Sequence, residues 1–194
     1  MPHVDHASYV RPASGHRVGG DAAVVARLGG GVLAAIVDVL GHGSEAHQVA
    51  RRAAAFLRQP SSTEPKALIE GLHEHLRGSR GAAAGISFVE PAADRLRYAG
   101  LGNTVIRKFG AREVRLVSRD GVLGERMRTP REEELGLTAG DVVVLYTDGV
   151  RAHFRLDDYP RLLSDTAATA ARKIVEDFGK AYDDAGCIVL RIRR

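Results

Sequence analysis

The sequence has no tryptophan, one cysteine and two methionines, and aromatic residues make up only 5% of its 194 positions. A single cysteine excludes an intrachain disulfide and is typical of a reducing compartment. Because Cys187 lies in an apolar run, we interpret it as a buried hydrophobic residue and not as a nucleophile. With so few aromatic residues, alanine, valine and leucine must fill most of the core.

Long hydrophobic runs are missing as well. The longest apolar runs, such as residues 32–37, are far shorter than the ~20 residues that a membrane-spanning helix needs. The first residues include neither a basic stretch nor an apolar segment of the kind found in secretion signals, so we expect a cytoplasmic protein.

A run of lysine and arginine is also absent. The formal net charge of +4 comes from 28 basic and 24 acidic residues that are scattered along the chain. Without a basic cluster or an aromatic-basic stripe, this excess is a weak signal for nucleic-acid binding. We interpret Arg191, Arg193 and Arg194 as solvated charges at the end of a strand.

What is present is the composition of an ordinary globular protein, with 44% hydrophobic and 27% charged residues. The length suits one domain with a sizeable core, so we predict a single domain over residues 1–194. No internal repeat or long linker divides it.

The hydrophobic periodicity predicts helices and strands in an order that defines the fold class. Residues 44–58, a segment from Pro65 to a stop at Gly78, and a face running from Ala167 to Tyr182 after an N-cap at Asp165 show helical spacing. Short strands are expected at residues 22–28, 32–39, 85–89, 96–99, 105–109, 114–117, 142–146 and 187–192, with a polar stretch at 126–134. This order predicts an α+β fold in which helices pack on largely antiparallel sheet.

Two aspartates face each other across the first predicted hairpin. If Gly29-Gly30 is a two-residue turn, Leu28 pairs with Gly31 and Asp21 pairs with Asp38. A three-residue turn would instead make the two aspartates diagonal neighbours. Carboxylates directly opposite each other repel, so this pair needs either a shared proton or a cation between its members.

Further carboxylates also stand at strand ends. Asp38 leads into the glycine-rich turn Gly41-His42-Gly43, where a main-chain carbonyl could join the carboxylate as a ligand. Asp148 follows a fully apolar strand, and the pair Asp183-Asp184 precedes the last one. Oxygen ligands without a cysteine or histidine cluster favour Mg²⁺ or Mn²⁺ over zinc.

Together these segments resemble the metal-dependent protein phosphatases, the PPM or type 2C family, and in particular their SpoIIE-like bacterial branch. The matching motifs follow in family order over about residues 15–192: Gly20-Asp21, Asp38-Val-Leu-Gly-His-Gly43, Gly100-Leu-Gly-Asn-Thr104, Gly121-Val-Leu-Gly124, Gly140-Asp-Val-Val-Val-Leu-Tyr-Thr-Asp-Gly149 and Asp183-Asp184. The short chain and its Leu-Gly-His-Gly turn are most similar to the RsbX type of stressosome phosphatase. Gly186 and Ala152 depart from the pattern, since threonine and glutamate are common at these positions in the branch.

The resemblance implies an α/β/β/α sandwich that hydrolyses phosphoserine or phosphothreonine with metal-activated water. It implies two Mn²⁺ or Mg²⁺ ions held by Asp21, Asp38, the Val39 carbonyl, Asp148 and Asp183, with Asp184 as the alternative to Asp183. Asp38, Asp21, Asp148 and Asp183 are thus the expected catalytic residues, and the expected partners are phosphorylated STAS-domain signalling proteins of the stressosome or anti-anti-sigma type.

Two further residues near the expected metal site in the sequence are candidates for roles other than metal binding. Arg17, four residues before Asp21, is the candidate for binding phosphate. His42 could protonate the leaving oxygen or support the turn structurally.

Other readings remain open from the residues alone. A pseudophosphatase would keep the fold and bind phosphoproteins without turnover, and a small-molecule phosphoesterase would use the same site on another substrate. The high isoelectric point, about 9.5, suggests a nucleic-acid-binding module as a third interpretation.

Overall fold

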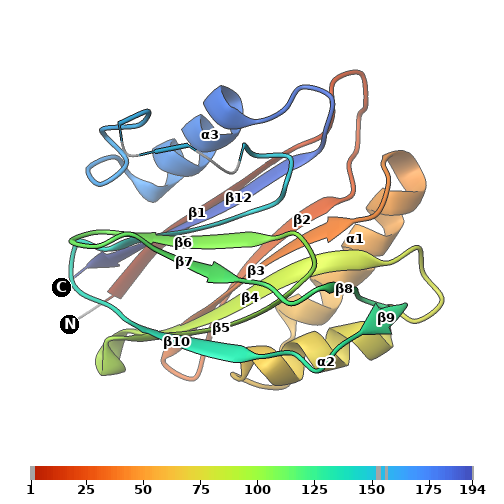
Figure 1. Cartoon of the computed structure of the whole chain (residues 1–194), viewed down its shortest axis with the longest axis horizontal. Coiled ribbons are helices and arrows are strands. Elements are labelled where there is room, and N and C mark those ends of the chain that lie inside the picture. The colour runs from red at the N-terminus through yellow and green to blue at the C-terminus, as the bar shows by residue number, and fades with distance from the viewer. Residues whose placement is uncertain (1–2, 152–153, 156, 194) are drawn as a thin grey trace.

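The computed structural model of the chain describes residues 3–151, 154–155 and 157–193, so Ala152 and Arg194 lie outside the described residues. Two five-stranded, antiparallel sheets stack face to face (Figure 1). The first sheet has the order β1-β12-β11-β6-β7, with bounds His3–Arg11, Ala185–Arg193, Val142–Tyr146, Val105–Phe109 and Val114–Val117. The second has the order β10-β5-β4-β3-β2, with bounds Glu132–Gly136, Arg95–Leu101, Ala82–Glu90, Gly31–Val39 and Asp21–Leu28.

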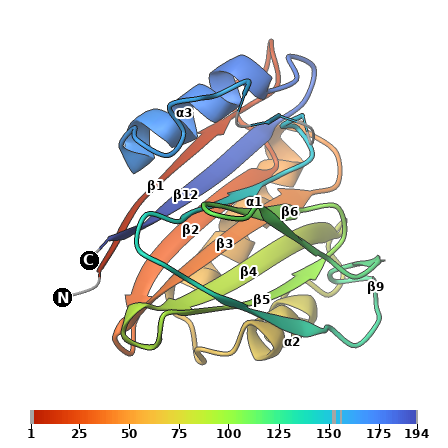
Figure 2. The same ribbon diagram turned by 60° about the vertical axis from the view of Figure 1, so that its left-hand side comes forward.

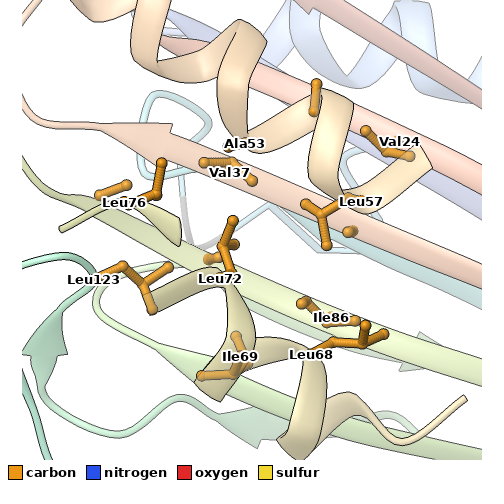
Figure 3. Packing of buried hydrophobic residues seen from close by; sticks show 14 of the residues in the cluster. Val24, Val37, Ala53, Leu57, Leu68, Ile69, Leu72, Leu76, Ile86 and Leu123 are labelled. Atoms are coloured by element: carbon orange, nitrogen blue, oxygen red, sulfur yellow. The ribbon is translucent and has the colours of Figure 1, made fainter. Parts of the chain in front are cut away.

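Helices cover the outer face of each sheet. Helices α1 (Gly43–Arg58) and α2 (Pro65–His75) pack on the second sheet, and Figure 3 shows Leu57, Leu68 and Leu72 pointing into this layer. Helix α3 (Ala167–Phe178) lies across β1 and β12 on the first sheet, as Figure 2 shows from a second direction. A third apolar cluster joins the inner faces of the two sheets. The α+β prediction and the four-layer sandwich are confirmed.

The central strands owe their position to their residue types. All five residues of β11 are buried, as are the first seven of β3, and both strands lie inside their sheets with a helix layer on one side and the other sheet on the opposite side. A strand that is buried on both faces has no use for alternating polar residues. The continuous runs of valine, leucine, isoleucine and alanine therefore indicated the middle of the fold.

Several local predictions were wrong. The polar stretch contributes strands β9 (Arg126–Met127) and β10, and β9 pairs with β8 (Gly121–Val122). Polar residues suit these strands because β10 is an edge strand and the β8–β9 pair is a small separate hairpin.

The start and end of the third helix also differ from expectation. The N-cap of α3 is Thr166, whose hydroxyl accepts the N–H of Thr169 at 3.1 Å. Asp165 is instead buried and accepts a hydrogen bond from the Tyr159 hydroxyl. The helix ends at Phe178, so Tyr182 lies beyond its apolar face and is 80% exposed.

Arg191 was misread as a solvated charge. Its side chain is buried, and it donates hydrogen bonds to the main-chain carbonyls of Leu162, Leu163 and Asp165. It therefore fixes the segment that leads into α3.

A smaller feature concerns membranes. In the part of the chain that the structure describes, none of the helices has the length and apolar character to cross a bilayer.

Candidate active site

The predicted carboxylates gather at one end of the sandwich. Asp21 begins β2 and Asp38 lies near the end of β3, and the two residues are directly paired as the two-residue turn predicts. Asp148 follows β11 by two residues, and Asp183 and Asp184 directly precede β12. The two chain termini meet at the other end, where β1 starts and β12 finishes (Figure 1).

Asp21 is buried and held in place by the neighbouring sheet. Its carboxylate accepts a hydrogen bond of 2.7 Å from the Thr147 hydroxyl, which in turn accepts the N–H of Gly186 at 2.9 Å. Burial raises the pKa of Asp21 well above its ordinary value, and Asp38 raises it further, while the hydrogen bond from Thr147 acts in the opposite direction. Thr147 thus orients Asp21, a role that sequence reasoning missed.

Asp38 is the centre of the cluster. Burial raises its pKa to about 7, and the nearby carboxylates of Asp148 and Asp183 act in the same direction. The side chain of Asn103 acts in the opposite direction and lowers the pKa of Asp38. Neighbouring carboxylates that repel one another need either a shared proton or a bound cation.

The adjacent residues Asp183 and Asp184 have different surroundings. The carboxylate of Asp184 is buried and accepts the main-chain N–H groups of Ala13 at 2.8 Å and Gly20 at 2.6 Å. It therefore ties the loop between β1 and β2 to the start of β12. Asp183 is partly exposed, and its pKa is raised by burial and by Asp148 and lowered by Lys180.

Val39 is the last residue of β3, so its carbonyl lies at the end of that strand. Val39 donates its N–H to the Gly20 carbonyl, whereas Gly20 gives its own N–H to Asp184. A Cβ placed on Gly20 would lie 3.0 Å from the Val39 oxygen and 3.2 Å from the Gly41 oxygen. Glycine at position 20 therefore leaves room for main-chain oxygens beside the aspartates.

Asn103 is the clearest residue that sequence reasoning missed. It stands in the turn between β5 and β6, after Gly102 with a φ of 88°, and its amide donates a hydrogen bond of 2.7 Å to Asp148. Asn103 also lowers the pKa of Asp38, so one neutral side chain acts on two of the carboxylates. The glycine-flanked asparagine after a strand was a visible signal, but nothing in the sequence shows which carboxylates it meets.

The other two candidates, Arg17 and His42, lie at the surface of the protein. Arg17 is exposed in the loop between β1 and β2. His42 is exposed at the N-cap of α1, makes no side-chain capping bond there, and its ring lies 4.9 Å from that of His16.

The donor set agrees in kind with a hard divalent cation. Asp21, Asp38, Asp148 and Asp183 present carboxylate oxygens, the donors that Mg²⁺ and Mn²⁺ prefer. Burial and neighbouring carboxylates raise the pKa values of Asp21, Asp38 and Asp183, which indicates a local excess of negative charge. Among the described residues, however, no three acidic, histidine or cysteine side chains are already arranged as a metal cage.

Comparison with known proteins gives a consistent picture. The family model of stage II sporulation protein E (SpoIIE) matches residues 29–193. A search of curated protein sequences finds no match.

Solved structures match over nearly the whole chain. A chain from a study of the bacterial stressosome as a modular system for secondary messenger signalling superposes with a TM-score of 0.88 and 27% identity, over 97% of this chain and all of that one. RsbX in complex with magnesium superposes with a TM-score of 0.84 and 18% sequence identity, over 98% of this chain and 96% of that one. The PP2C phosphatase domain of SpoIIE from Bacillus subtilis, with a fragment of its regulatory domain, superposes with a TM-score of 0.79 and 19% sequence identity. The match covers 97% of this chain and 63% of that one.

The family match covers most of the chain. It includes all the aspartates of the cluster except Asp21, which lies before the matched residues. The structural matches share the two stacked sheets and the flanking helices. The chain belongs to the SpoIIE family and has the fold of the PP2C-type protein phosphatases.

Proposed function

We propose that this protein is a metal-dependent protein serine/threonine phosphatase whose active site is the aspartate cluster at the end of the two sheets. The observation that carries the proposal is the convergence of Asp38, Asp148 and Asp183 within electrostatic reach of one another. A fold has no stability reason to place three acids together, because their repulsion raises the free energy of the folded state. Family membership and the PP2C fold support the same activity.

The surroundings of each aspartate suggest its part in holding two Mg²⁺ or Mn²⁺ ions. Asp38, at the centre, would contact both ions, with Asp21 and the Val39 carbonyl on one side and Asp148 and Asp183 on the other. Both carboxylate oxygens of Asp184 already accept main-chain N–H groups, which favours Asp183 as the ligand of the pair. Magnesium is bound in the RsbX structure that resembles this chain, which supports the choice of metal.

The protein groups then have separate tasks. When bound, the two ions would lower the pKa of a water molecule so that hydroxide is available as the nucleophile near neutral pH, and they would offset negative charge on the phosphoryl oxygens. Thr147 keeps Asp21 oriented by its hydrogen bond, and Asn103 holds Asp148 through its amide. Such supporting hydrogen bonds commonly change metal affinity or activity 10- to 100-fold when they are removed. Arg17 stays a candidate for phosphate binding, and His42 stays open between proton donor and structural support.

The proposed substrates are phosphorylated STAS-domain proteins of the stressosome or anti-anti-sigma type. The support is similarity, because this chain shares its fold with RsbX and 27% of its residues with a chain from the stressosome study. A cytoplasmic location would suit such partners and the single buried cysteine.

The test is release of phosphate from a phosphorylated STAS-domain protein in the presence of Mn²⁺ or EDTA. We expect release with Mn²⁺, none with EDTA, and none from Asp38→Asn. Asp177→Asn is the matched control, because Asp177 is exposed on α3 and pairs only with Lys173 in the described structure. Confirmed Mn²⁺ binding without release from any phosphoprotein would contradict the proposal and favour a pseudophosphatase or a small-molecule enzyme.

A further inference from the structure

A cavity of about 670 Å³ opens beside the proposed active site. Asp148 and Asn103 are among its lining residues, together with residues of β6, β7 and the C-terminal end of α3. The volume falls in the range of ligand-binding pockets, about 300–1,000 Å³. We name this cavity the docking groove.

The floor of the docking groove is apolar and firmly anchored. It is formed by Val105, Val150, Phe154 and Phe178, of which the first three are buried. The rings of Phe154 and Phe178 stack with their centroids 5.1 Å apart. The Arg107 guanidinium donates a hydrogen bond of 2.6 Å to the Phe154 carbonyl, which fixes the floor from below.

The sides of the docking groove carry more positive than negative charge. Arg115 and Arg151 are exposed and Lys180 is partly buried, and within the described residues none of the three forms an ion pair. Asp158 and the active-site Asp148 are the acidic residues among the lining side chains. Lys180 lies at the active-site end, close enough to lower the pKa of Asp183.

We propose that the docking groove binds the segment of the phosphoprotein that flanks the phosphorylated residue. An apolar side chain of that segment would lie on the floor, and acidic side chains would face Arg115 and Arg151. The inference rests on the proposed function, because the groove gains this role only if phosphate is removed at Asp148 and its neighbours.

Two features favour a protein segment over a small phosphate compound. The groove is continuous with the active site, so a chain held in one would extend into the other. Its stacked aromatic floor offers apolar contact that a small, highly charged phosphate compound cannot use, whereas a peptide side chain can.

Four phosphoserine peptides of equal length test the inference. They carry leucine or alanine near the phosphoserine, combined with flanking glutamates or lysines. With Mn²⁺, we expect kcat/KM of the wild type to be about tenfold higher for the leucine–glutamate peptide than for the alanine–lysine peptide, since opposite charges favour association. We expect Arg115→Glu combined with Arg151→Glu to reverse the preference between glutamate and lysine peptides.

Arg112→Glu is the matched control, because Arg112 is exposed in the turn after β6 and does not line the docking groove. This variant should keep the wild-type preference. Equal rates on all four peptides, or a double variant that still prefers glutamate, would overturn the docking groove and leave the phosphatase proposal intact. If the double variant does not fold, the wild-type preference alone decides. A wild type that releases phosphate from neither the peptides nor p-nitrophenyl phosphate overturns the proposed function and this inference with it.

Discussion

Buried charges occur in two regions of this protein, and the two regions balance them differently. Beneath α3 and along β6, three buried or partly buried cations of the described chain have partners. Lys108 pairs with Asp141 at 3.1 Å, Arg107 with Glu113, and Arg191 with three main-chain carbonyls. At the strand ends, Asp21, Asp38 and Asp183 lie near other acids, and burial together with these acids raises their pKa values.

This difference separates the groups that hold the fold together from the groups that are available for chemistry. A paired buried charge compensates its own desolvation, and removing one partner is costly because the other is left alone. An unpaired group of carboxylates instead destabilises the fold and is retained only for a ligand that neutralises it. Substitutions in the two regions should therefore have opposite signatures.

The largest effect is expected for Asp38→Asn. Phosphate release should fall at least about 1,000-fold, since metal ions supply several kcal/mol to such reactions and each tenfold step is about 1.4 kcal/mol. In EDTA at pH 8 the same variant should melt at the wild-type temperature or higher, because it removes a charge from a repulsive cluster. Parallel assays of phosphate release and thermal unfolding check both parts, and a strong loss of stability would contradict the comparison.

Next comes the contrast between the two adjacent aspartates. Asp184→Ala leaves two buried N–H groups without their charged acceptor, so we expect a loss of about 3 kcal/mol and a melting temperature about 6–12 °C lower. Asp183→Ala should change the melting temperature in EDTA by less than about 2 °C while lowering activity. Equal melting temperatures for the two variants would show that Asp184 does not have the structural role assigned to it.

Arg191→Met tests the balanced region. Three carbonyls would lose a charged donor, for which we expect a loss of about 2–3 kcal/mol, measured by urea unfolding. Arg193→Met is the control, because Arg193 is 45% exposed and reaches Asp5 only at 4.0 Å. It should cost less than about 0.5 kcal/mol. A similar small cost for Arg191 would remove the distinction between the two regions.

Asn103→Ala sharpens the account of the active site. Without the amide, Asp148 loses its hydrogen-bond donor, and we expect Mn²⁺ affinity to fall about 10- to 100-fold. Calorimetric titration with Mn²⁺ measures this directly, and Asn103→Asp should be worse because it adds a further negative charge. If both variants bind Mn²⁺ with wild-type affinity, Asn103 serves only to form the turn and does not support metal binding.

The last effect is a pH dependence of stability in the metal-free protein. The folded-state pKa of Asp38 is raised to about 7, above its value in the unfolded chain, so the folded state holds more protons between about pH 4 and pH 7. The contribution of Asp38 to the free energy of unfolding should therefore decrease as pH rises through this window and level off above it. Urea unfolding in EDTA at several pH values should show a shallower decrease for Asp38→Asn, and an unchanged slope would contradict this assignment.

Much of the fold could be predicted because its signals are local. The runs 105–109, 114–117 and 142–146 are strands with the predicted bounds, since apolar β-branched residues dominate them. The Asp21–Asp38 pairing followed from the length of one turn. Strands β9 and β10 were missed because their polar residues suit exposed positions, where hydrophobic periodicity is absent.

The candidate site was less predictable, since it depends on contacts between distant segments. Sequence motifs picked out the aspartates, but Asp183 and Asp184 differ only through the loop of Ala13 and Gly20, more than 160 positions away. Arg191 looked like a terminal charge because its partners, the carbonyls of residues 162, 163 and 165, carry no side-chain signal. Long-range main-chain partners of this kind leave no pattern in the sequence.

The central claim is that the repulsive aspartate cluster is a two-metal site organised around Asp38. Calorimetric titration of the metal-free protein with Mn²⁺, for the wild type, Asp38→Asn and the control Asp177→Asn, tests it most directly. The account predicts two bound ions for the wild type and the control, and loss of measurable binding for Asp38→Asn. A wild type that binds no Mn²⁺, or an Asp38→Asn variant that binds two ions with wild-type affinity, would contradict it.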